Sequence, residues 1–273
     1  VVECCPERHR PKLAGAIGAA ANFGFLFIGT VASIFPVTPG SWRWLMLVGA
    51  SPAVLALLIM FAVPESERWK AAAKTAKKQP ILEIFSPGMV KTTLLAIAFS
   101  AIPLIGTWAA VSGWTPLWVE QLTQAELVAR ALPESKMSEV PKSQLKEKLQ
   151  EARGQLPQAK WSEIDSVAAR AKANLQIILS IGAILGCFIA PVLGGRWGRR
   201  PVYFGLCLLS FVSCWWLFRY LDLKDGWLFW GMVGFAGCVT AAFYGWLPLY
   251  LPEIFPTRMR ATGQGLSFNF GRI

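Results

Sequence analysis

The sequence predicts an all-α protein that crosses the membrane several times. Hydrophobic residues make up 54% of the 273 residues, charged residues make up only 16%, and the mean hydropathy is +0.45. Ordinary soluble domains carry about 25% charged residues. The charges here fall in short clusters between apolar runs of about 17–25 residues, the length that a membrane-spanning helix requires. We therefore expect a multi-pass protein of the cell membrane.

Six complete apolar spans and the start of a seventh follow one another along the chain. Their expected ranges are 13–35, 44–63, 92–118, 173–193, 202–221 and 227–251, with the seventh beginning near 262. Small residues give two of the spans a closely packing face, and these are Gly182, Gly186, Gly231, Gly234 and Gly237. The chain lacks an initiator Met and opens on a loop-like motif, so we expect an internal fragment of a longer protein.

The basic clusters fall at every second junction between the predicted spans, and therefore on one side of the membrane. Clusters of Lys and Arg lie before the first span, after the second, between the fourth and fifth, and after the sixth. Short loops rich in Lys and Arg remain in the cytoplasm. This distribution accounts for the net charge of +11 by topology, so we expect membrane lipid, and no nucleic acid, among the partners.

The polar segment 122–172 then falls on the extracytoplasmic side. Three soluble helices are expected in it: from a capping box at Thr123–Glu126 to the residue before Pro133, from Ser143 to Arg153, and from a cap at Ser162–Asp165 into the fourth span. We interpret the segment as a solvated insertion. The alternative is a cap that binds a partner or guides the substrate.

The two ends of the chain carry the same motif. Its first copy is Glu3, Pro6, Arg8 and Arg10, which recur 250 residues later as Glu253, Pro256, Arg258 and Arg260. Each copy is followed by Asn-Phe-Gly, at Asn22 and again at Asn269. Internal repeats of this kind build many transporters. Without the insertion, the two copies are separated by about 200 residues, the length of six spans with short loops.

Two further motifs, together with the repeat, resemble the major facilitator superfamily. The loop 193–201 resembles the signature G-x-L-x-D-R-x-G-R-R through Leu193, Arg196, Gly198, Arg199 and Arg200, although Pro191 and Gly195 replace its first Gly and its Asp. The segment 64–69, with Glu65 and Arg68, is similar to the P-E-S-P-R signature of sugar-porter-like members. The terminal motifs resemble the loops after the fourth and tenth helices, and the second copy is most similar to the organic-anion, niacin and sialate-type branches.

The resemblance implies both a fold and an activity. The chain would hold helices five to eleven of a twelve-helix bundle: 1–63 would end the N-terminal half, 64–91 would be the central cytoplasmic loop, and 92–273 would belong to the C-terminal half. It implies a secondary transporter whose two halves rock about a central site and open alternately to each side. We expect a monomer that moves a small polar solute, an organic acid or sugar-like, coupled to a proton or a sodium ion.

Polar and aromatic side chains within the spans are the candidates for substrate binding, because such groups are costly in a membrane unless they face the bundle interior. These are Asn22, Thr107, Trp108, Ser112, Asn174, Gln176, Thr240, Tyr244 and Trp246. For each of them the alternative is a helix–helix hydrogen bond or an interfacial anchor.

The motif residues are the candidates for gating. They are Glu3, Arg10, Glu65, Arg68, Arg196, Gly198, Arg199, Arg200, Glu253, Arg258 and Arg260. Because Glu253 and the loop 196–200 belong to the same cytoplasmic end, we predict that Glu253 contacts Arg199 or Arg196, with Arg260 nearby.

The sequence does not favour an enzyme. It holds no Walker-type phosphate loop, no catalytic constellation and no metal-ligand spacing, so we expect neither a metal nor another cofactor. The alternative to a transporter is a transporter-like receptor or sensor that uses 122–172 as a ligand or partner module. A membrane enzyme ranks third.

Overall fold

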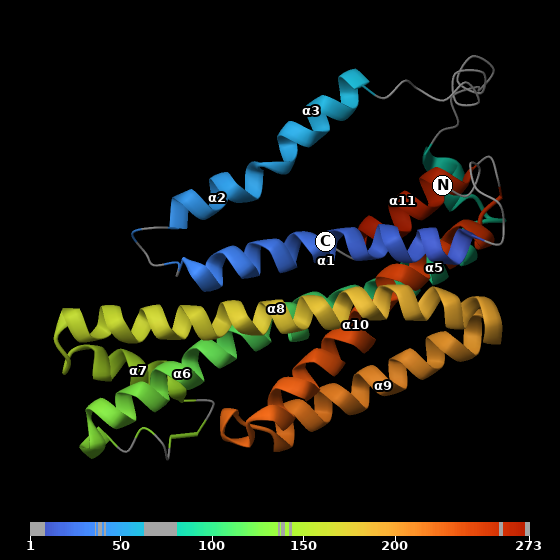
Figure 1. Ribbon diagram of the computed structural model, residues 1–273. Helices are drawn as coiled ribbons and strands as arrows, with labels where there is room; N and C mark the ends of the chain where they lie inside the picture. The colour runs from blue at the N-terminus through green and yellow to red at the C-terminus, as the bar shows by residue number, and fades with distance from the viewer. Residues whose placement is uncertain are drawn as a thin grey trace.

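The computed structural model describes residues 9–35, 37, 40, 42–62, 81–135, 137, 140–141, 144–256 and 259–270, and these form a bundle of long helices (Figure 1). Six of its segments are long and apolar enough to cross a membrane. They are α1 (Arg10–Ile34), the pair α2 (Trp42–Ala50) and α3 (Pro52–Ala62), the continuous run of α5 (Val90–Ile105), η3 (Gly106–Trp114) and α6 (Thr115–Ala131), α8 (Gln158–Trp197), α9 (Arg199–Tyr220) and α10 (Trp227–Ile254).

Shorter elements complete the described chain. They are η2 (Ile81–Phe85), η4 (Pro133–Ser135), α7 (Leu145–Arg153), η6 (Leu223–Asp225) and α11 (Arg260–Phe270). The predicted all-α membrane fold and the order of its spans are confirmed. Large apolar side chains such as Leu47, Leu58 and Phe61 are exposed on α2 and α3, which fits a surface that faces lipid rather than water.

Two spans continue well beyond the predicted membrane segments. The third predicted span, 92–118, runs without a break to Ala131, and α8 begins at Gln158, 15 residues before the predicted start at 173. The predicted capping box at Thr123 is therefore wrong. The helix has already begun there, and the Thr123 hydroxyl donates to the Val119 carbonyl in the preceding turn, at 2.8 Å. Likewise Ser162–Asp165 lies inside α8 and does not cap it.

The two extensions and α7 form a small helical unit with its own apolar cluster. Val128, Leu145, Leu149 and Trp161 are buried in this cluster, and α7 supplies two of them. The unit occupies the left end of the molecule in Figure 1. The predicted helices of the insertion are thus present. The third continues into the fourth span as predicted, and the first is also continuous with a span.

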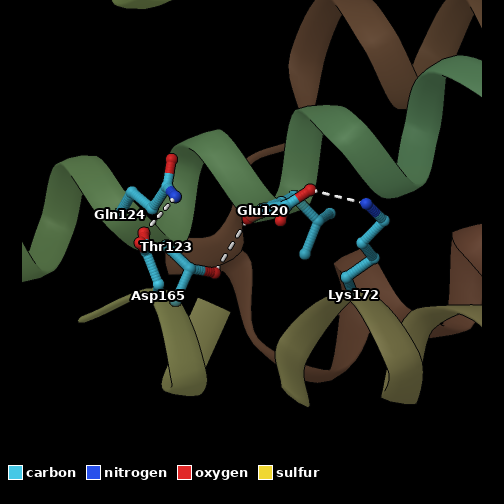
Figure 2. Close-up of polar contacts among 6 residues, drawn as sticks. Glu120, Thr123, Gln124, Asp165 and Lys172 are labelled. Atoms are coloured by element: carbon cyan, nitrogen blue, oxygen red, sulfur yellow. Dashed lines mark hydrogen bonds and ion pairs between the residues drawn. The ribbon is translucent and has the colours of Figure 1, made fainter. Parts of the chain in front are cut away.

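Polar contacts tie the extension of α6 to that of α8 (Figure 2). Lys172 donates to Glu120 at 2.7 Å, and Gln124 donates to Asp165 at 3.0 Å. Arg153 of α7 donates to the second carboxylate oxygen of Asp165 at 2.8 Å. Because these bonds join three helices, the insertion is fixed to the ends of two spans.

Small residues allow α8 to cross α10 closely at the centre of the bundle. A β-carbon on Gly182 would overlap the Gly234 carbonyl oxygen, and one on Gly186 would overlap the Cys238 carbonyl oxygen. The predicted small-residue face is confirmed for these positions and for Gly237. Gly231 differs, since a β-carbon there would meet open space.

Prolines inside the spans free carbonyl oxygens, which other helices then approach. Proline cannot donate to the carbonyl four residues earlier, so Pro103 leaves the Phe99 carbonyl open. The Tyr203 hydroxyl of α9 donates to it at 3.2 Å. Pro191 similarly frees the carbonyl of Cys187, against which α1 and α10 pack closely through their glycines. The carbonyl that Pro191 frees therefore lies where glycines of two other helices approach α8.

The arrangement predicts that the two ends of α8 face opposite sides of the membrane. The helical unit around α7 lies at one end of α8, and the basic turn at Gly198 lies at the other. We expect a single cysteine at Lys148 and one at Lys74, which lies outside the described residues, to be labelled from opposite sides in a protein that lacks its native cysteines. An impermeant maleimide on sealed cells measures this. Labelling of both positions from one side would contradict the topology.

Candidate functional site

A cavity of about 960 Å³ lies between α1, α10 and α11, with Trp108 of η3 at one end. It is lined on α1 from Arg10 to Phe25, on α10 from Tyr244 to Glu253, and on α11 from Arg260 to Asn269. The three charged side chains in its described lining come from the motif end of the bundle. The cavity therefore extends from the predicted cytoplasmic end toward the middle of the spans.

A small cavity of about 20 Å³ lies next to the large one and shares part of its lining. Seven of the nine predicted substrate residues line this small cavity: Asn22, Thr107, Trp108, Ser112, Gln176, Thr240 and Tyr244. Three of them, Asn22, Trp108 and Tyr244, line the large cavity too. These three come from three different elements, so tertiary packing places them together where the two cavities adjoin.

The polar groups around the small cavity are largely committed to one another. Thr107 donates to the Thr240 carbonyl at 2.9 Å, and Thr240 donates to the Ala236 carbonyl at 2.7 Å. Gln176 donates to the Ser180 hydroxyl at 3.3 Å. Both threonines are 5% exposed. The Thr107 hydroxyl thus joins η3 to α10, which was the alternative interpretation of this residue, whereas the Thr240 hydroxyl bonds within α10.

Asn22 and the aromatic residues beside it face the larger space. The Asn22 amide donates to the Gly18 carbonyl at 3.3 Å and to the Cys187 sulfur at 3.6 Å, so its side-chain oxygen can still accept a bond. The rings of Phe25 and Trp108 meet edge to face, with centroids 5.4 Å apart. This pair forms an aromatic wall where the cavity narrows.

The other two predicted substrate residues lie elsewhere. Residues two positions apart on a helix point in nearly opposite directions, so Asn174 is exposed although Gln176 lines the small cavity. In the same way Trp246 turns away from the side of Tyr244. It is 2% exposed and packs against Tyr203 and Tyr250, with ring centroids 4.8 and 4.7 Å away.

The predicted contact between Glu253 and Arg199 is confirmed. Arg199 donates to both carboxylate oxygens, from Nη2 at 2.7 Å and from Nε at 3.1 Å. Its Nη1 donates to the Gly194 carbonyl at 2.6 Å, near the end of α8. Gly198 alone separates α8 from α9, and its φ of 94° favours glycine. One arginine therefore joins the end of α10 to the turn between α8 and α9.

The remaining motif residues divide into three groups. Arg10 and Arg260 line the large cavity together with Glu253. That Arg260 lies near this carboxylate stays a prediction. Arg196 and Arg200 are exposed. The others lie outside the described residues and are Glu3, Glu65, Arg68 and Arg258.

Sequence reasoning missed several lining residues. Nothing in the sequence distinguishes Phe25 and Phe268 from other apolar side chains of the spans. Gln264 falls in the last, partial span. Asn269 could have been found, because the terminal repeat pairs it with Asn22 and both line the cavity. Ser180 lies one helical turn from Gln176 and lines the small cavity with it.

Comparison with known proteins gives a consistent family assignment. Residues 1–129 match the family described as Major Facilitator Superfamily, and residues 135–273 match the family described as Sugar (and other) transporter. No solved structure matches significantly.

Two bacterial relatives match the chain from end to end. The probable 4-methylmuconolactone transporter of Cupriavidus pinatubonensis is 23% identical over 100% of this chain and 54% of its own length. The cis,cis-muconate transport protein of Acinetobacter baylyi is 22% identical over 100% of this chain and 57% of its own length. Inositol transporter 4 of Arabidopsis thaliana is 33% identical over 32% of this chain and 15% of its own length. The chain thus spans little more than half the length of the relatives that it matches fully.

Proposed function

Because the chain belongs to the major facilitator superfamily, we propose that it is the substrate-binding part of a secondary transporter. The transporter moves a small polar solute, an organic acid or a sugar-like polyol, across the membrane by alternating access. A proton or a sodium ion is the proposed coupling ion. The relatives are named as transporters of inositol, of muconate and of a muconolactone, which supports this class of solute.

The cavity between α1, α10 and α11 is the observation that carries the proposal. Ligand sites are concave and mostly apolar, with a few placed polar groups, and this cavity has that character. Asn22 and Tyr244 provide polar groups beside the Phe25–Trp108 pair, while alanine, proline and leucine residues cover much of the rest. A volume of about 960 Å³ is ample for a metabolite of this size.

Alternating access also requires contacts that form and break at one end of the bundle. The Arg199–Glu253 pair joins two helix hairpins at the predicted cytoplasmic end. We propose that it stabilises one arrangement of these hairpins and loosens in the other.

Uptake by the full-length protein tests the proposal. The protein is purified and reconstituted in liposomes, and accumulation of labelled cis,cis-muconate and of labelled myo-inositol is measured with and without imposed proton or sodium gradients. Saturable accumulation of either solute above protein-free liposomes is the expected result. Gradient-dependent accumulation identifies the coupling ion, and absence of flux for both solutes would contradict the proposal.

Replacing each of two asparagines with alanine tests where the solute binds. Replacing Asn22 with alanine should raise the KM of uptake about two- to tenfold, because one hydrogen bond to the solute is lost. Asn174 has the same side chain but is exposed on α8, away from the cavity, so Asn174→Ala should leave the KM unchanged. The two variants are compared at matched expression. Equal effects would place the solute elsewhere.

The second candidate function is a transporter-like receptor or sensor. The compact unit around α7, with its own buried cluster and its ties to two spans, favours it, since such a unit could transmit ligand binding to the membrane helices. Saturable binding of a solute without flux would support a receptor. Saturable accumulation would support a transporter.

A further inference from the structure

The polar side chains around the small cavity come from four different elements. η3 is a π-helix, in which hydrogen bonds join residues five apart, so Thr107 and Ser112 lie one turn apart on the same side of it. Gln176 and Ser180 are four apart on α8 and share a face in the same way. With one residue each from α1 and α10, the amide and aliphatic hydroxyl side chains of the described lining are Asn22, Thr107, Ser112, Gln176, Ser180 and Thr240.

Most protons of these groups are already donated to the protein. Both threonine hydroxyls donate to main-chain carbonyls of α10, and the Ser180 hydroxyl donates to the Gln176 main-chain carbonyl at 2.7 Å. The Asn22 nitrogen, which carries two protons, makes two hydrogen bonds. What these groups can still contribute to an occupant of the cavity is therefore mainly oxygen lone pairs.

The same hydrogen bonds fix which way the two carboxamides point. Because the Ser180 proton goes to a carbonyl, the Ser180 oxygen can only accept from Gln176, which must present its nitrogen. The Gly18 carbonyl also only accepts, so Asn22 presents its nitrogen there. The amide oxygens of Asn22 and Gln176 remain as acceptors. A water molecule in such a lining would find few donors for its own lone pairs, whereas a cation needs acceptors alone.

The chemistry of the lining favours one kind of cation. The described lining of the small cavity contains no Asp, Glu, His, Lys or Arg, so it offers a proton no group that titrates near neutral pH. Divalent ions such as Mg²⁺ and Ca²⁺ are usually held by carboxylates, whereas transporters coordinate Na⁺ with neutral carbonyl oxygens. One water-sized occupant needs a volume of about 10–15 Å³, and the cavity has about 20 Å³. A single Na⁺ therefore fits, and the larger K⁺ fits less well.

We propose that the small cavity is a Na⁺ site and that Na⁺ is the ion coupled to the transported solute. The inference rests on the proposed transport function and deepens it by choosing between the two coupling ions. Asn22 and Trp108 line both cavities, so the ion and the solute share a wall. Coupling between two sites is reciprocal: if Na⁺ tightens solute binding, the solute tightens Na⁺ binding by the same factor.

Sodium binding is measured first, without any solute. The unfolding midpoint of the full-length protein, purified in detergent, is followed as NaCl replaces choline chloride at constant ionic strength and, separately, as KCl replaces it. A ligand that binds only the folded protein raises the midpoint. We expect NaCl to raise it saturably by at least about 2 °C and KCl to raise it by less than half as much. No rise with NaCl, or equal rises with both salts, would overturn the site.

Two variants test the assigned residues. Gln176→Leu removes an amide oxygen, and Ser112→Ala removes a hydroxyl with little change in volume. Each should weaken the apparent Na⁺ affinity, read from the same midpoint titration, about fivefold or more, because a ligand of the ion is lost. Ser112→Ala carries the test if Gln176→Leu does not fold. An Na⁺ response equal to that of the wild type in the folded variants would overturn the assignment.

Asn174→Leu is the matched control. It removes the same chemical group two residues away on α8, from an exposed position outside both cavities. Its apparent Na⁺ affinity should stay within about twofold of the wild type. A loss equal to that of Gln176→Leu would mean that the carboxamides of α8 act through the helix and not through the cavity.

Uptake separates the coupling role from the transport function. Accumulation of labelled cis,cis-muconate and of labelled myo-inositol in liposomes that contain the full-length protein is compared under a Na⁺ gradient, a proton gradient and neither. We expect the Na⁺ gradient alone to drive accumulation above equilibrium. Saturable uptake that is unaffected by Na⁺, or that follows the proton gradient, would overturn the coupling role while leaving transport intact. Absence of saturable uptake of both solutes would instead contradict the transport function, and with it the coupling.

Discussion

Replacing Gly186 with valine is expected to lower the unfolding temperature of the full-length protein by about 6–12 °C. A β-carbon at this position would overlap the backbone oxygen of Cys238 on α10. Backbone cannot move aside as a flexible side chain can, so α8 and α10 must separate. Overpacking of a well-packed core costs about 1–3 kcal/mol and occasionally more, and an overlap with backbone belongs at the upper end of that range. The midpoint is measured by circular dichroism on protein purified in detergent.

Gly231 of α10 provides the matched control. A β-carbon there would meet open space, and the residue is exposed. Gly231→Val should therefore shift the midpoint by no more than about 2 °C. An equal shift for both variants would mean that valine acts through helix propensity and not through the crossing of α8 and α10.

Breaking the pair between Arg199 and Glu253 is expected to slow transport about five- to thirtyfold while leaving the protein in the membrane. Side chains of this pair are 25% and 46% exposed, so their attraction is partly screened by water and contributes little to overall stability. Its effect falls on the balance between two arrangements of the hairpins, where about 1–2 kcal/mol changes a population five- to thirtyfold. Arg199→Ala should be the more severe change, because it also loses the bond to Gly194.

A double-mutant cycle of uptake rates shows whether the two residues act together. The combined loss in Arg199→Ala/Glu253→Gln should be smaller than the product of the separate losses, since either change alone removes the contact. Arg196→Ala, in the last turn of α8 and exposed, should have a smaller effect than Arg199→Ala. Independent, multiplicative losses would remove the gating role from the pair.

The gate and the solute site make separable contributions to transport. Glu253 lines the cavity, so Glu253→Gln removes a negative charge from its wall. If the solute is an anion, this change should slow turnover without raising the KM. Asn22→Ala should show the reverse pattern, a raised KM.

The sequence by itself determined the class of the protein and the order of its spans. Apolar runs of membrane length separated by basic clusters have one physical solution, because a backbone in lipid must satisfy its hydrogen bonds within each helix. The contact of Glu253 with Arg199 was also predictable. The repeat and the loop motif place both at one end of the bundle, where opposite charges attract.

The lengths of the two longest helices could not be read from the sequence. Thr123–Glu126 has the pattern of a helix start, yet the chain is already helical there and the turn continues. Local propensity does not distinguish a new helix from the continuation of an old one. Packing of α6, α7 and α8 around Trp161 decided it.

Tertiary structure alone decided which polar residues share the cavity. Asn22 and Asn174 are equally polar and both fall within predicted spans, but only the first faces the space between α1, α10 and α11. Tyr244 and Trp246 are two residues apart and point in opposite directions, one into the cavity and one into the core. A helix presents each residue at an angle set by its own turn, and the side of the helix that becomes the cavity depends on how its neighbours pack. The hydrophobic pattern of a membrane helix carries little of that information, because lipid and protein interior are both apolar.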